Sequence, residues 1–243
     1  MYDIHCHIIF GVDDGSDSIE ESIKMAKIAY ESGVSAIVAT PHCNIPDSYS
    51  NYWGRELFGR VTALRRALDE NNVPVKIYCG QEIYCTSRTH ELLSAGKLIT
   101  INGSKYALVE FDFHEYSSSV YEKLSKIIAE GYVPVIAHPE RYSFVSEEDD
   151  AAMRLKSMGC LLQVNKGSLS GFFGRDAQRI AYRMLDKRIA DFVASDAHSP
   201  FMRTTEMENA FEAVCENFSM DYADLLFDEN PRRAIENKTV FAY

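Results

Sequence analysis

The chain of 243 residues has no apolar run as long as a membrane span, no low-complexity tract and no internal repeat. It is also short of basic residues: 25 Lys and Arg stand against 36 Asp and Glu, a formal net charge of −11. This deficit argues against nucleic acid as the main partner, because binding the phosphate backbone requires a basic surface. We therefore expect neither membrane insertion nor nucleic-acid binding.

The six cysteines lack the paired spacing of a zinc ribbon. Several lie in apolar segments, where a free thiol behaves as a small hydrophobic side chain. No signal peptide is recognisable, so we expect reduced thiols in a cytoplasmic protein. A cysteine phosphatase needs an Arg six positions after its nucleophile. Two His-Cys pairs occur, but Val12 follows Cys6 and Tyr49 follows Cys43 at that distance. The sequence therefore does not predict a thiol-based phosphatase.

Two histidines stand close together near the start of the chain. His5 and His7 are two residues apart in an apolar segment that is typical of a buried strand. Residues two apart in a strand point to the same face, so the pattern predicts neighbouring imidazoles that suit a divalent cation. Asp14, a few residues later, could close over such an ion. A His-x-His pattern alone is common by chance, and a metal site becomes convincing only with further ligands.

Short apolar runs alternate with segments of helical spacing along the chain. The first helix begins with a capping-box pattern at Ser18 and Glu21 and ends at Gly33, and a later helix is expected near 147–158. Seven strands are expected, at the start of the chain and at 36–40, 75–79, 106–109, 133–137, 161–164 and 192–194. This alternation predicts an α/β fold whose parallel sheet closes or nearly closes into a barrel, with the helices outside. We expect a single domain over residues 1–243.

Polar residues follow nearly every expected strand at its C-terminal end, where the active sites of α/β barrels assemble. These residues are His42, Glu82, Glu110, His138, Asp196 and His198. Together with His5, His7 and Asp14 they make a set of five histidines and four carboxylates. Such a cluster is costly unless cations compensate it, and nine ligands suit three divalent ions. Mixed imidazole and carboxylate ligation favours manganese, iron or zinc over magnesium. Each residue alone has a structural explanation, such as a helix cap for Asp196; His90 and His114 fit surface positions.

The motifs that carry these residues resemble those of the PHP (polymerase and histidinol phosphatase) superfamily. The matching segments are His5-x-His7 with Asp13-Asp14-Gly15, Thr40-Pro41-His42, Gly80-x-Glu82, His138-Pro139-Glu140-Arg141-Tyr142 and Ser195-Asp196-x-His198. In their order and in the HPERY-type motif they are similar to the bacterial metal-dependent protein-tyrosine phosphatases of capsule and exopolysaccharide operons. The resemblance spans almost the whole chain.

This resemblance implies a distorted (β/α)7 TIM-like barrel with three metal ions, commonly manganese. It implies a phosphotyrosine substrate, usually the tail of a partner bacterial tyrosine kinase that controls polysaccharide export. It further implies that the nine residues above are the metal ligands, with Glu82 as the bridge, and that Arg141 and Arg203 bind phosphate. A hydroxide bridging the metals would then attack phosphorus while the two guanidiniums hold the phosphoryl oxygens. Two departures, Lys166 and Thr204–Thr205, put the substrate contacts in question but not the metals.

Other functions fit the same motifs. A small-molecule phosphatase of the superfamily, such as histidinol phosphatase, would hold identical metals. A non-catalytic PHP binding module would be marked by lost ligands, and none is lost here; a PHP nuclease is disfavoured by the acidic balance. Arg141 and Arg203 could instead be ordinary surface ion pairs. The segment 44–60 is expected to begin with a loop before the next helix. The aromatic residues of this loop, from Tyr49 to Phe58, could stack on a substrate ring or pack as a lid on the barrel.

Overall fold

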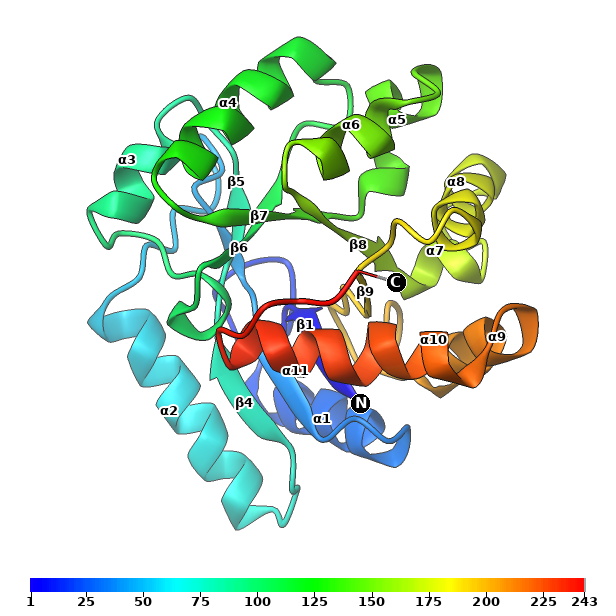
Figure 1. The fold of residues 1–243 in the computed structure, drawn as a ribbon. Helices are drawn as coiled ribbons and strands as arrows, with labels where there is room; N and C mark the ends of the chain where they lie inside the picture. Colours follow the sequence, from blue (N-terminus) through cyan, green and yellow to red (C-terminus); the bar gives the residue numbers. More distant parts are fainter. Residues whose placement is uncertain (243) are drawn as a thin grey trace.

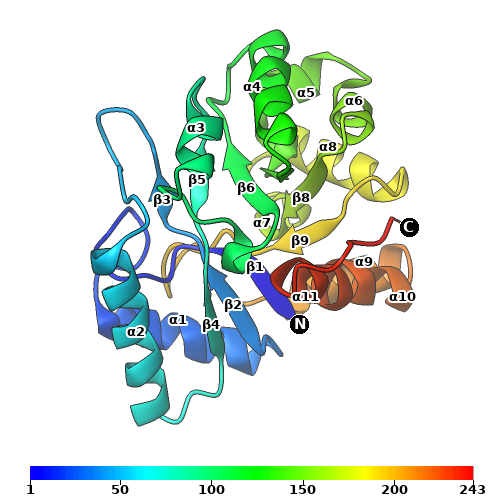
Figure 2. The same cartoon turned by 60° about the vertical axis from the view of Figure 1, so that its left-hand side comes forward.

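Within residues 1–242, which the computed structural model describes, nine parallel strands form a barrel-like wall with helices on its outside (Figures 1 and 2). Tyr243, the last residue of the predicted domain, lies outside the described residues. One sheet has the order β1 (Tyr2–Cys6), β2 (Ala36–Ala39) and β4 (Lys76–Cys79). The other has the order β3 (His42–Cys43), β5 (Glu82–Tyr84), β6 (Tyr106–Glu110), β7 (Val133–Ala137), β8 (Leu161–Asn165) and β9 (Phe192–Ala194).

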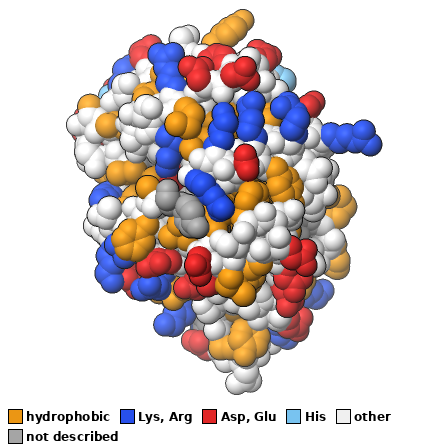
Figure 3. Space-filling model, turned by 45° about the vertical axis from the view of Figure 1, so that its right-hand side comes forward, with side chains coloured by type: hydrophobic (Ala, Val, Ile, Leu, Met, Phe, Trp, Pro, Cys, Tyr) orange, Lys and Arg blue, Asp and Glu red, His pale blue; other side chains and the backbone are white. Residues whose placement is uncertain are grey.

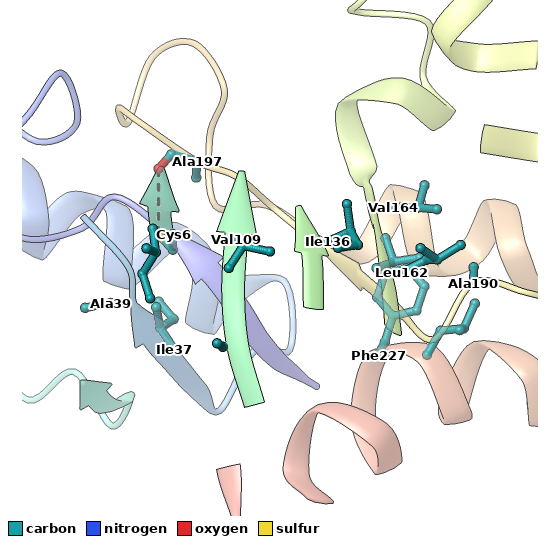
Figure 4. Packing of buried hydrophobic residues seen from close by; sticks show 14 of the residues in the cluster. Cys6, Ile37, Ala39, Val109, Ile136, Leu162, Val164, Ala190, Ala197 and Phe227 are labelled. Atoms are coloured by element: carbon teal, nitrogen blue, oxygen red, sulfur yellow. Dashed lines mark hydrogen bonds between the residues drawn. The ribbon is translucent and has the colours of Figure 1, made fainter. Parts of the chain in front are cut away.

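The two sheets continue into each other, which confirms the predicted α/β barrel class. β2 of the three-stranded sheet is followed directly by β3 of the six-stranded sheet, and β4 is followed directly by β5. The chain therefore runs from one sheet into the other at two places. At the other side a single bridge pairs Cys6 with Ala197, and the Cys6 thiol lies 3.9 Å from the Ala197 carbonyl oxygen (Figure 4). β1 therefore lies beside the chain that leaves β9.

Nine strands are present among the described residues where seven were expected. The additional strands, β3 and β5, have two and three residues, too few for a hydrophobic period to reveal them. Gly80 lies at the break between β4 and β5, where an added Cβ would come within 2.7 Å of the Val38 side chain. The break thus depends on a residue without a side chain, and Glu82 begins a strand instead of following one.

The helices have the following bounds. They are α1 (Ile19–Glu31), α2 (Arg55–Glu70), α3 (Thr89–Ser94), α4 (Ser117–Ala129), α5 (Ser143–Glu147), α6 (Ala151–Ser157), α7 (Lys166–Leu169), α8 (Arg175–Asp186), α9 (Glu208–Asn217), α10 (Met220–Asp224) and α11 (Asn230–Ile235). Two short 3₁₀ turns are η1 (Ile101–Gly103) and η2 (Pro139–Arg141), and η3 (Leu225–Glu229) is a π-helical segment. The capping box of α1 is confirmed in part: Ser18 accepts a hydrogen bond from the Glu21 amide, but the Glu21 carboxylate accepts from the amide of Asp17, at 3.2 Å, instead of from that of Ser18.

Three local predictions were wrong. β1 ends at Cys6, so His7 follows the strand instead of lying in it. A single helix was expected near 147–158, but two short helices, α5 and α6, occupy this region. α2 begins at Arg55, so Phe58 belongs to a helix and not to the aromatic loop. In each case a short element or a boundary was involved, where periodicity is least informative.

Two groups of buried apolar side chains fill the molecule. The larger joins the strands to the surrounding helices and includes Val109 and Leu162 (Figure 4). The smaller includes Tyr106, the first residue of β6, together with Ala234 and Ile235 of α11. The C-terminal helix therefore packs on the starts of the strands, and the opposite end of the barrel is left for polar residues.

The surface carries both signs of charge despite the acidic total. Figure 3 shows a row of Lys and Arg side chains across the upper half of one face, with hydrophobic side chains below it. Among the described residues, no helix is both long enough and apolar enough to cross a membrane.

Candidate active site

Glu82 lies at the centre of a buried polar cluster at the C-terminal ends of the strands. Its Oε1 lies 2.8 Å from His138 Nε2. Its Oε2 lies 3.2 Å from His5 Nε2, 3.1 Å from His7 Nε2 and 3.0 Å from His42 Nδ1. A single carboxylate therefore faces four imidazoles from different parts of the chain.

Register explains part of this convergence. His42 of β3 pairs directly with Glu82 of β5, and Glu110 at the end of β6 pairs with Tyr84. His42 Nδ1 consequently lies 2.9 Å from a Glu110 oxygen as well as close to Glu82. The short strands that were not foreseen are thus the elements that align these ligand candidates.

Eight of the nine residues expected from the sequence fall into three groups whose donor atoms lie within 4.8 Å of one another. The groups are His5, His7, Glu82 and Asp196; His7, Asp14, His42 and His198; and His42, Glu82 and Glu110. The ninth residue, His138, faces Glu82 as described above. His90 and His114 lie outside these groups, and His114 is exposed as expected.

Hydrogen bonds on the far side of the rings orient three of the histidines. His5 Nδ1 donates to Gln163 at 2.8 Å, His7 Nδ1 donates to Asp13 at 2.8 Å, and His198 Nδ1 donates to the Asp196 carbonyl at 3.0 Å. A proton on Nδ1 leaves each Nε2 lone pair directed at the cluster, which is the arrangement that metal-binding histidines require.

Asp13 and Gln163 were not predicted as site residues. Asp13 also accepts a hydrogen bond from the His42 amide at 2.8 Å, so one carboxylate orients parts of two ligand segments. The adjacent Gly15 leaves room for this turn, because a Cβ there would come within 2.3 Å of the His7 carbonyl oxygen. Asp13 could have been suspected from its motif, whereas Gln163 carries no local signal within β8.

The electrostatics of the cluster are strained without a cation. Burial lowers the pKa of His198 to about 2, and the neighbouring His7 adds to the effect. Burial has the same sense at His42, but Glu82 outweighs it and raises the pKa of His42 to about 10. Burial also raises the pKa of Glu110, and the charge of Glu82 raises it further. Neighbouring groups of the same charge therefore disfavour each other's ionisation.

The donor set fits divalent cations. His5 Nε2 and His7 Nε2 face each other at 3.3 Å, although two bare imidazole nitrogens repel each other. Among the described residues, His42 Nδ1, Glu82 Oε2 and Glu110 Oε1 are buried without a properly aligned hydrogen-bond partner. Unsatisfied buried polar atoms are costly, and convergent imidazole and carboxylate atoms are suitable ligands for Mn²⁺, Fe²⁺ or Zn²⁺.

Asp196 connects this cluster to two arginines. Its Oδ1 faces the histidines, at 3.5 Å from His5 Nε2, while its Oδ2 lies 2.5 Å from Arg203 Nη2 and 3.6 Å from Arg141 Nη1. The two arginine side chains are 20% and 25% exposed, for Arg141 and Arg203 respectively. Arg203 Nε is buried and has no hydrogen-bond partner among the described residues. These residues are therefore not ordinary surface ion pairs.

Aromatic rings hold the arginines in place. The Arg141 guanidinium lies 4.5 Å from the centre of the Phe113 ring and 4.2 Å from that of Phe173. Arg203 lies 5.6 Å from the same Phe173 ring. Stacking of this kind fixes a guanidinium plane while leaving its N–H groups available. Neither phenylalanine was predicted, because both lie in irregular segments without a motif.

Three site residues have left-handed backbone conformations: His138, Asp196 and Arg203, with φ of 36°, 49° and 51°. Residues other than glycine rarely adopt such angles, and each costs on the order of 1–3 kcal/mol. Two of these residues lie where the chain leaves a strand: His138 directly follows β7, and Asp196 lies two residues after β9.

Both arginines and seven of the nine ligand candidates line one cavity of about 410 Å³, and His5 and His7 are the two that do not. Tyr49 and Phe113 also line it, and the Tyr49 ring is stacked on His42 with centroids 5.9 Å apart. Trp53, by contrast, packs against the apolar core. Within the predicted aromatic loop, only Tyr49 therefore lies at the site. Lys166 and Thr204, which depart from the expected pattern, line a neighbouring cavity instead.

Comparison with known proteins agrees with this arrangement. The sequence profile of the family described as "Capsular polysaccharide synthesis, CpsB/CapC" matches residues 1–236. The tyrosine-protein phosphatase YwqE of Bacillus subtilis is 32% identical over 248 residues, covering 99% of this chain and 94% of its own length.

Solved structures extend the comparison. One from the work on YwqE of Bacillus subtilis and CpsB of Streptococcus pneumoniae, described as unique metal-dependent tyrosine phosphatases, matches with a TM-score of 0.93. It is 31% identical, and the match covers 100% of this chain and 97% of that one. A histidinol phosphate phosphatase of Lactococcus lactis, solved with zinc, histidinol and phosphate, shares the fold at 13% identity and a TM-score of 0.56, covering 93% of this chain and 94% of that one.

Proposed function

Because the chain belongs to the CpsB/CapC family of capsular polysaccharide synthesis proteins, we propose that it is a metal-dependent protein-tyrosine phosphatase. The observation that carries the proposal is the position of Asp196, which faces the histidine cluster with one oxygen and both arginines with the other. A phosphate bound between the arginines would therefore lie against the metal ligands. This is the arrangement that phosphoryl transfer requires, since its charge develops on the phosphoryl oxygens.

The nine predicted residues would hold the metals. Three donor groups suit three ions, of which manganese is our first choice and iron or zinc the alternatives. Glu82 belongs to two of these groups and would bridge two ions. When bound, such ions supply a nucleophilic water at neutral pH, because coordination lowers the pKa of water from ~15.7 to about 7.

The two arginines would bind and orient the phosphoryl group. Asp196 and the rings of Phe113 and Phe173 hold the guanidiniums in place before substrate arrives, so little reorganisation accompanies the reaction. The free Nε of Arg203 offers a buried donor that no described protein atom uses. Paired N–H groups match the geometry of phosphate oxygens better than an ammonium does.

The cavity favours an aryl ester. Tyr49 and Phe113 line it and offer faces against which a phenyl ring can pack. A volume of about 410 Å³ is within the range of ligand cavities and accommodates a phosphorylated tyrosine side chain. A phenol, with a pKa of about 10, also leaves more readily than an alkoxide, so the chemistry places little demand on a general acid.

The proposed physiological substrate is the phosphotyrosine-containing tail of a bacterial tyrosine kinase that regulates capsule or exopolysaccharide synthesis. The family's description in terms of capsular polysaccharide synthesis, and the name tyrosine-protein phosphatase borne by YwqE, support this choice. A histidinol-phosphatase-like activity remains the competing proposal, because the shared fold extends to that enzyme. A non-catalytic role is disfavoured, since all nine ligand positions are filled by suitable residues.

The test is a substrate panel assayed on protein of measured metal content. A phosphotyrosyl peptide, the matching phosphoseryl peptide and histidinol phosphate are compared after chelation and after reloading with manganese. We expect turnover of the phosphotyrosyl peptide only with metal, and much weaker turnover of the others. A preference for histidinol phosphate would replace the proposal with its competitor. Full activity after verified metal removal would refute both.

A further inference from the structure

A second cavity, of about 370 Å³, adjoins the proposed active site. It lies between α7, the loop that follows His198, and α9, and its walls are mainly apolar: Leu169, Phe172, Phe173, Phe201, Met202 and Ala210. None of these residues is a ligand candidate, and only Phe173 also contacts the two arginines of the proposed active site. In another protein, an engineered cavity of about 150 Å³ holds a benzene ring. The larger cavity here therefore has space for any single apolar side chain.

The wall between the two cavities is thin. Arg203 lines both of them, and the Phe173 ring lies 5.6 Å from its guanidinium. An extended peptide advances about 3.3–3.6 Å per residue, so three residues span roughly 10 Å. A peptide that places a phosphorylated tyrosine in the first cavity therefore brings its near neighbours to the second.

Large apolar side chains stand exposed at this place. Phe201 is 71% exposed, Met202 is 67% exposed and Phe172 is 54% exposed, and all three line the second cavity. Isolated exposed apolar residues need no explanation, but a group of them around a cavity marks a binding surface. The group lies in the segment from His198 to Arg203 and beside α7, so it is continuous with the phosphate-binding arginine.

The charged groups at this cavity are already engaged. The Lys166 ammonium donates a hydrogen bond to the Glu206 carbonyl, and a Glu206 carboxylate oxygen accepts one from the Asn209 amide. Arg203 is paired with Asp196. An acidic side chain entering the cavity would therefore find both cations of the lining, Lys166 and Arg203, already paired. An apolar side chain would contact Leu169, Phe172 and Met202.

We propose that the second cavity is a specificity subsite that binds an apolar side chain of the substrate, within three residues of the phosphotyrosine. This inference rests on the proposed phosphatase function and adds a sequence preference to it. Burying a Leu- or Phe-sized side chain corresponds to a gain of about 10- to 100-fold in kcat/KM. The gain should appear in peptide substrates only, because a small aryl phosphate cannot reach across Arg203.

The experiment compares phosphotyrosyl peptides of one length and charge that carry Ala, Leu or Glu at each position from three before to three after the tyrosine. p-Nitrophenyl phosphate is the substrate without flanking residues. We expect Leu to exceed Ala by about tenfold or more at one of these positions. Equal kcat/KM for Leu and Ala at every position, or a preference for Glu, would overturn the subsite.

A variant that fills the cavity makes the test specific. Ala213→Trp places an indole in the second cavity from α9, and Glu212→Trp, at an exposed position on the same helix, is the matched control. We expect Ala213→Trp to abolish the Leu preference and leave p-nitrophenyl phosphate turnover unchanged, with Glu212→Trp behaving as the unmodified protein. A Leu preference that persists in Ala213→Trp would overturn the inference.

Phe172→Ala provides a second variant in case the tryptophan disturbs folding. This side chain is exposed, so its truncation leaves the core intact, and it should reduce the Leu preference. An unchanged preference in this variant would count against the subsite. If the metal-loaded protein hydrolysed neither p-nitrophenyl phosphate nor any phosphotyrosyl peptide, the proposed function itself would fail, which is a different result from a phosphatase without sequence preference.

Discussion

The two halves of the proposed active site are built by different means. All the predicted site residues of the first wall, from β1 to β6, are histidines and carboxylates: His5, His7, Asp14, His42, Glu82 and Glu110. The second wall, from β7 to the loop after β9, supplies two arginines besides three candidate ligands: His138, Arg141, Asp196, His198 and Arg203. The first wall resembles a metal-binding site, and the second adds the means to bind an anion.

Backbone geometry separates the walls as clearly as charge does. None of the six ligand candidates in the first wall has a positive φ, whereas His138, Asp196 and Arg203 of the second wall all do. Strands align the first set through register, but sharp turns must redirect the second set. Strain at the second wall is tolerated because hydrogen bonds fix its loops: Glu140 accepts from Ser168 at 2.6 Å and from the Asn165 amide at 2.9 Å. We therefore expect variants of the first wall to lose metal, and variants of the arginines in the second wall to keep metal but lose activity.

The largest effect is expected from Glu82→Gln in the first wall. Removing the central carboxylate's charge should lower both metal content and turnover, the latter by at least about 1000-fold, or about 4 kcal/mol. Steady-state kinetics with metal analysis of the same samples measures this. Glu56→Gln, at an exposed position on α2, is the matched control. A Glu82→Gln protein with normal metal content and activity would show that the first wall is not the metal site.

The next effect concerns the second wall alone. Arg203→Ala and Arg141→Ala should keep their metals but lose about 2–4 kcal/mol of transition-state stabilisation, as other preorganised donors do. Lysine at either position should restore activity only in part, because it lacks the paired donors. Kinetics on a phosphotyrosyl peptide, beside Arg179→Ala on the exposed face of α8, separates these outcomes. Near-normal kcat/KM in both alanine variants would remove the functional difference between the walls.

A smaller effect is expected where an outer hydrogen bond supports the first wall. Asp13→Asn weakens the bond that orients His7 and should reduce metal affinity by about 10- to 100-fold. Activity should recover at saturating metal, because the ligands themselves remain. Metal titration monitored by activity tests this, with the exposed Asp17→Asn as control. An unaltered titration curve would mean that Asp13 has no influence on the ligands.

The pH dependence of the metal-free protein should reveal the protons that metals replace. The pKa of His42 rises from 6.5 to about 10 in the folded state, because Glu82 outweighs the opposing effect of burial. A group whose pKa is raised on folding contributes stability that is fully present below its unfolded-state pKa. This contribution is lost as the pH rises through the folded-state pKa. The free energy of unfolding without metal should therefore fall between pH 6.5 and about 10.

Urea unfolding at several pH values, with and without manganese, measures this slope. Metal should flatten it, since a bound cation displaces the proton. His198 does not contribute in this window, because its lowered pKa affects stability only below pH 6.5. The variant His42→Asn should lose part of the slope. Identical slopes with and without metal would contradict the exchange of protons for cations.

The smallest effect is expected from thiol modification. Burial raises the pKa of Cys43, Cys85 and Cys160 to about 12, so these thiols stay protonated and unreactive near neutral pH. Cys215, which is half-buried, should be the main site of alkylation by iodoacetamide. Activity should survive this treatment, as mass spectrometry and kinetics on one sample would establish. Inactivation that parallels alkylation, and that Cys215→Ser does not prevent, would restore a thiol mechanism.

The ligand candidates and the fold class could be predicted from the sequence for a physical reason. Parallel strands alternating with helices must present all their C-terminal ends at one rim, so His42, Glu110 and Asp196 could be expected together before any coordinates were known. Most of these residues also lie in short motifs that can be recognised in the sequence itself. Boundaries were less predictable, and β3 and β5 were missed because two or three residues carry no period.

Only the tertiary structure decided how these residues are supported and what surrounds them. Gln163 orients His5 across 158 positions of sequence, and the Phe173 ring contacts both arginines from an irregular segment. The second cavity, between α7 and α9, likewise has no counterpart in any local pattern. Local sequence determines which donor atoms a strand end presents, because that depends on neighbouring residues. Contacts between distant segments determine orientation, protonation and cavity shape, because they depend on packing of the whole chain.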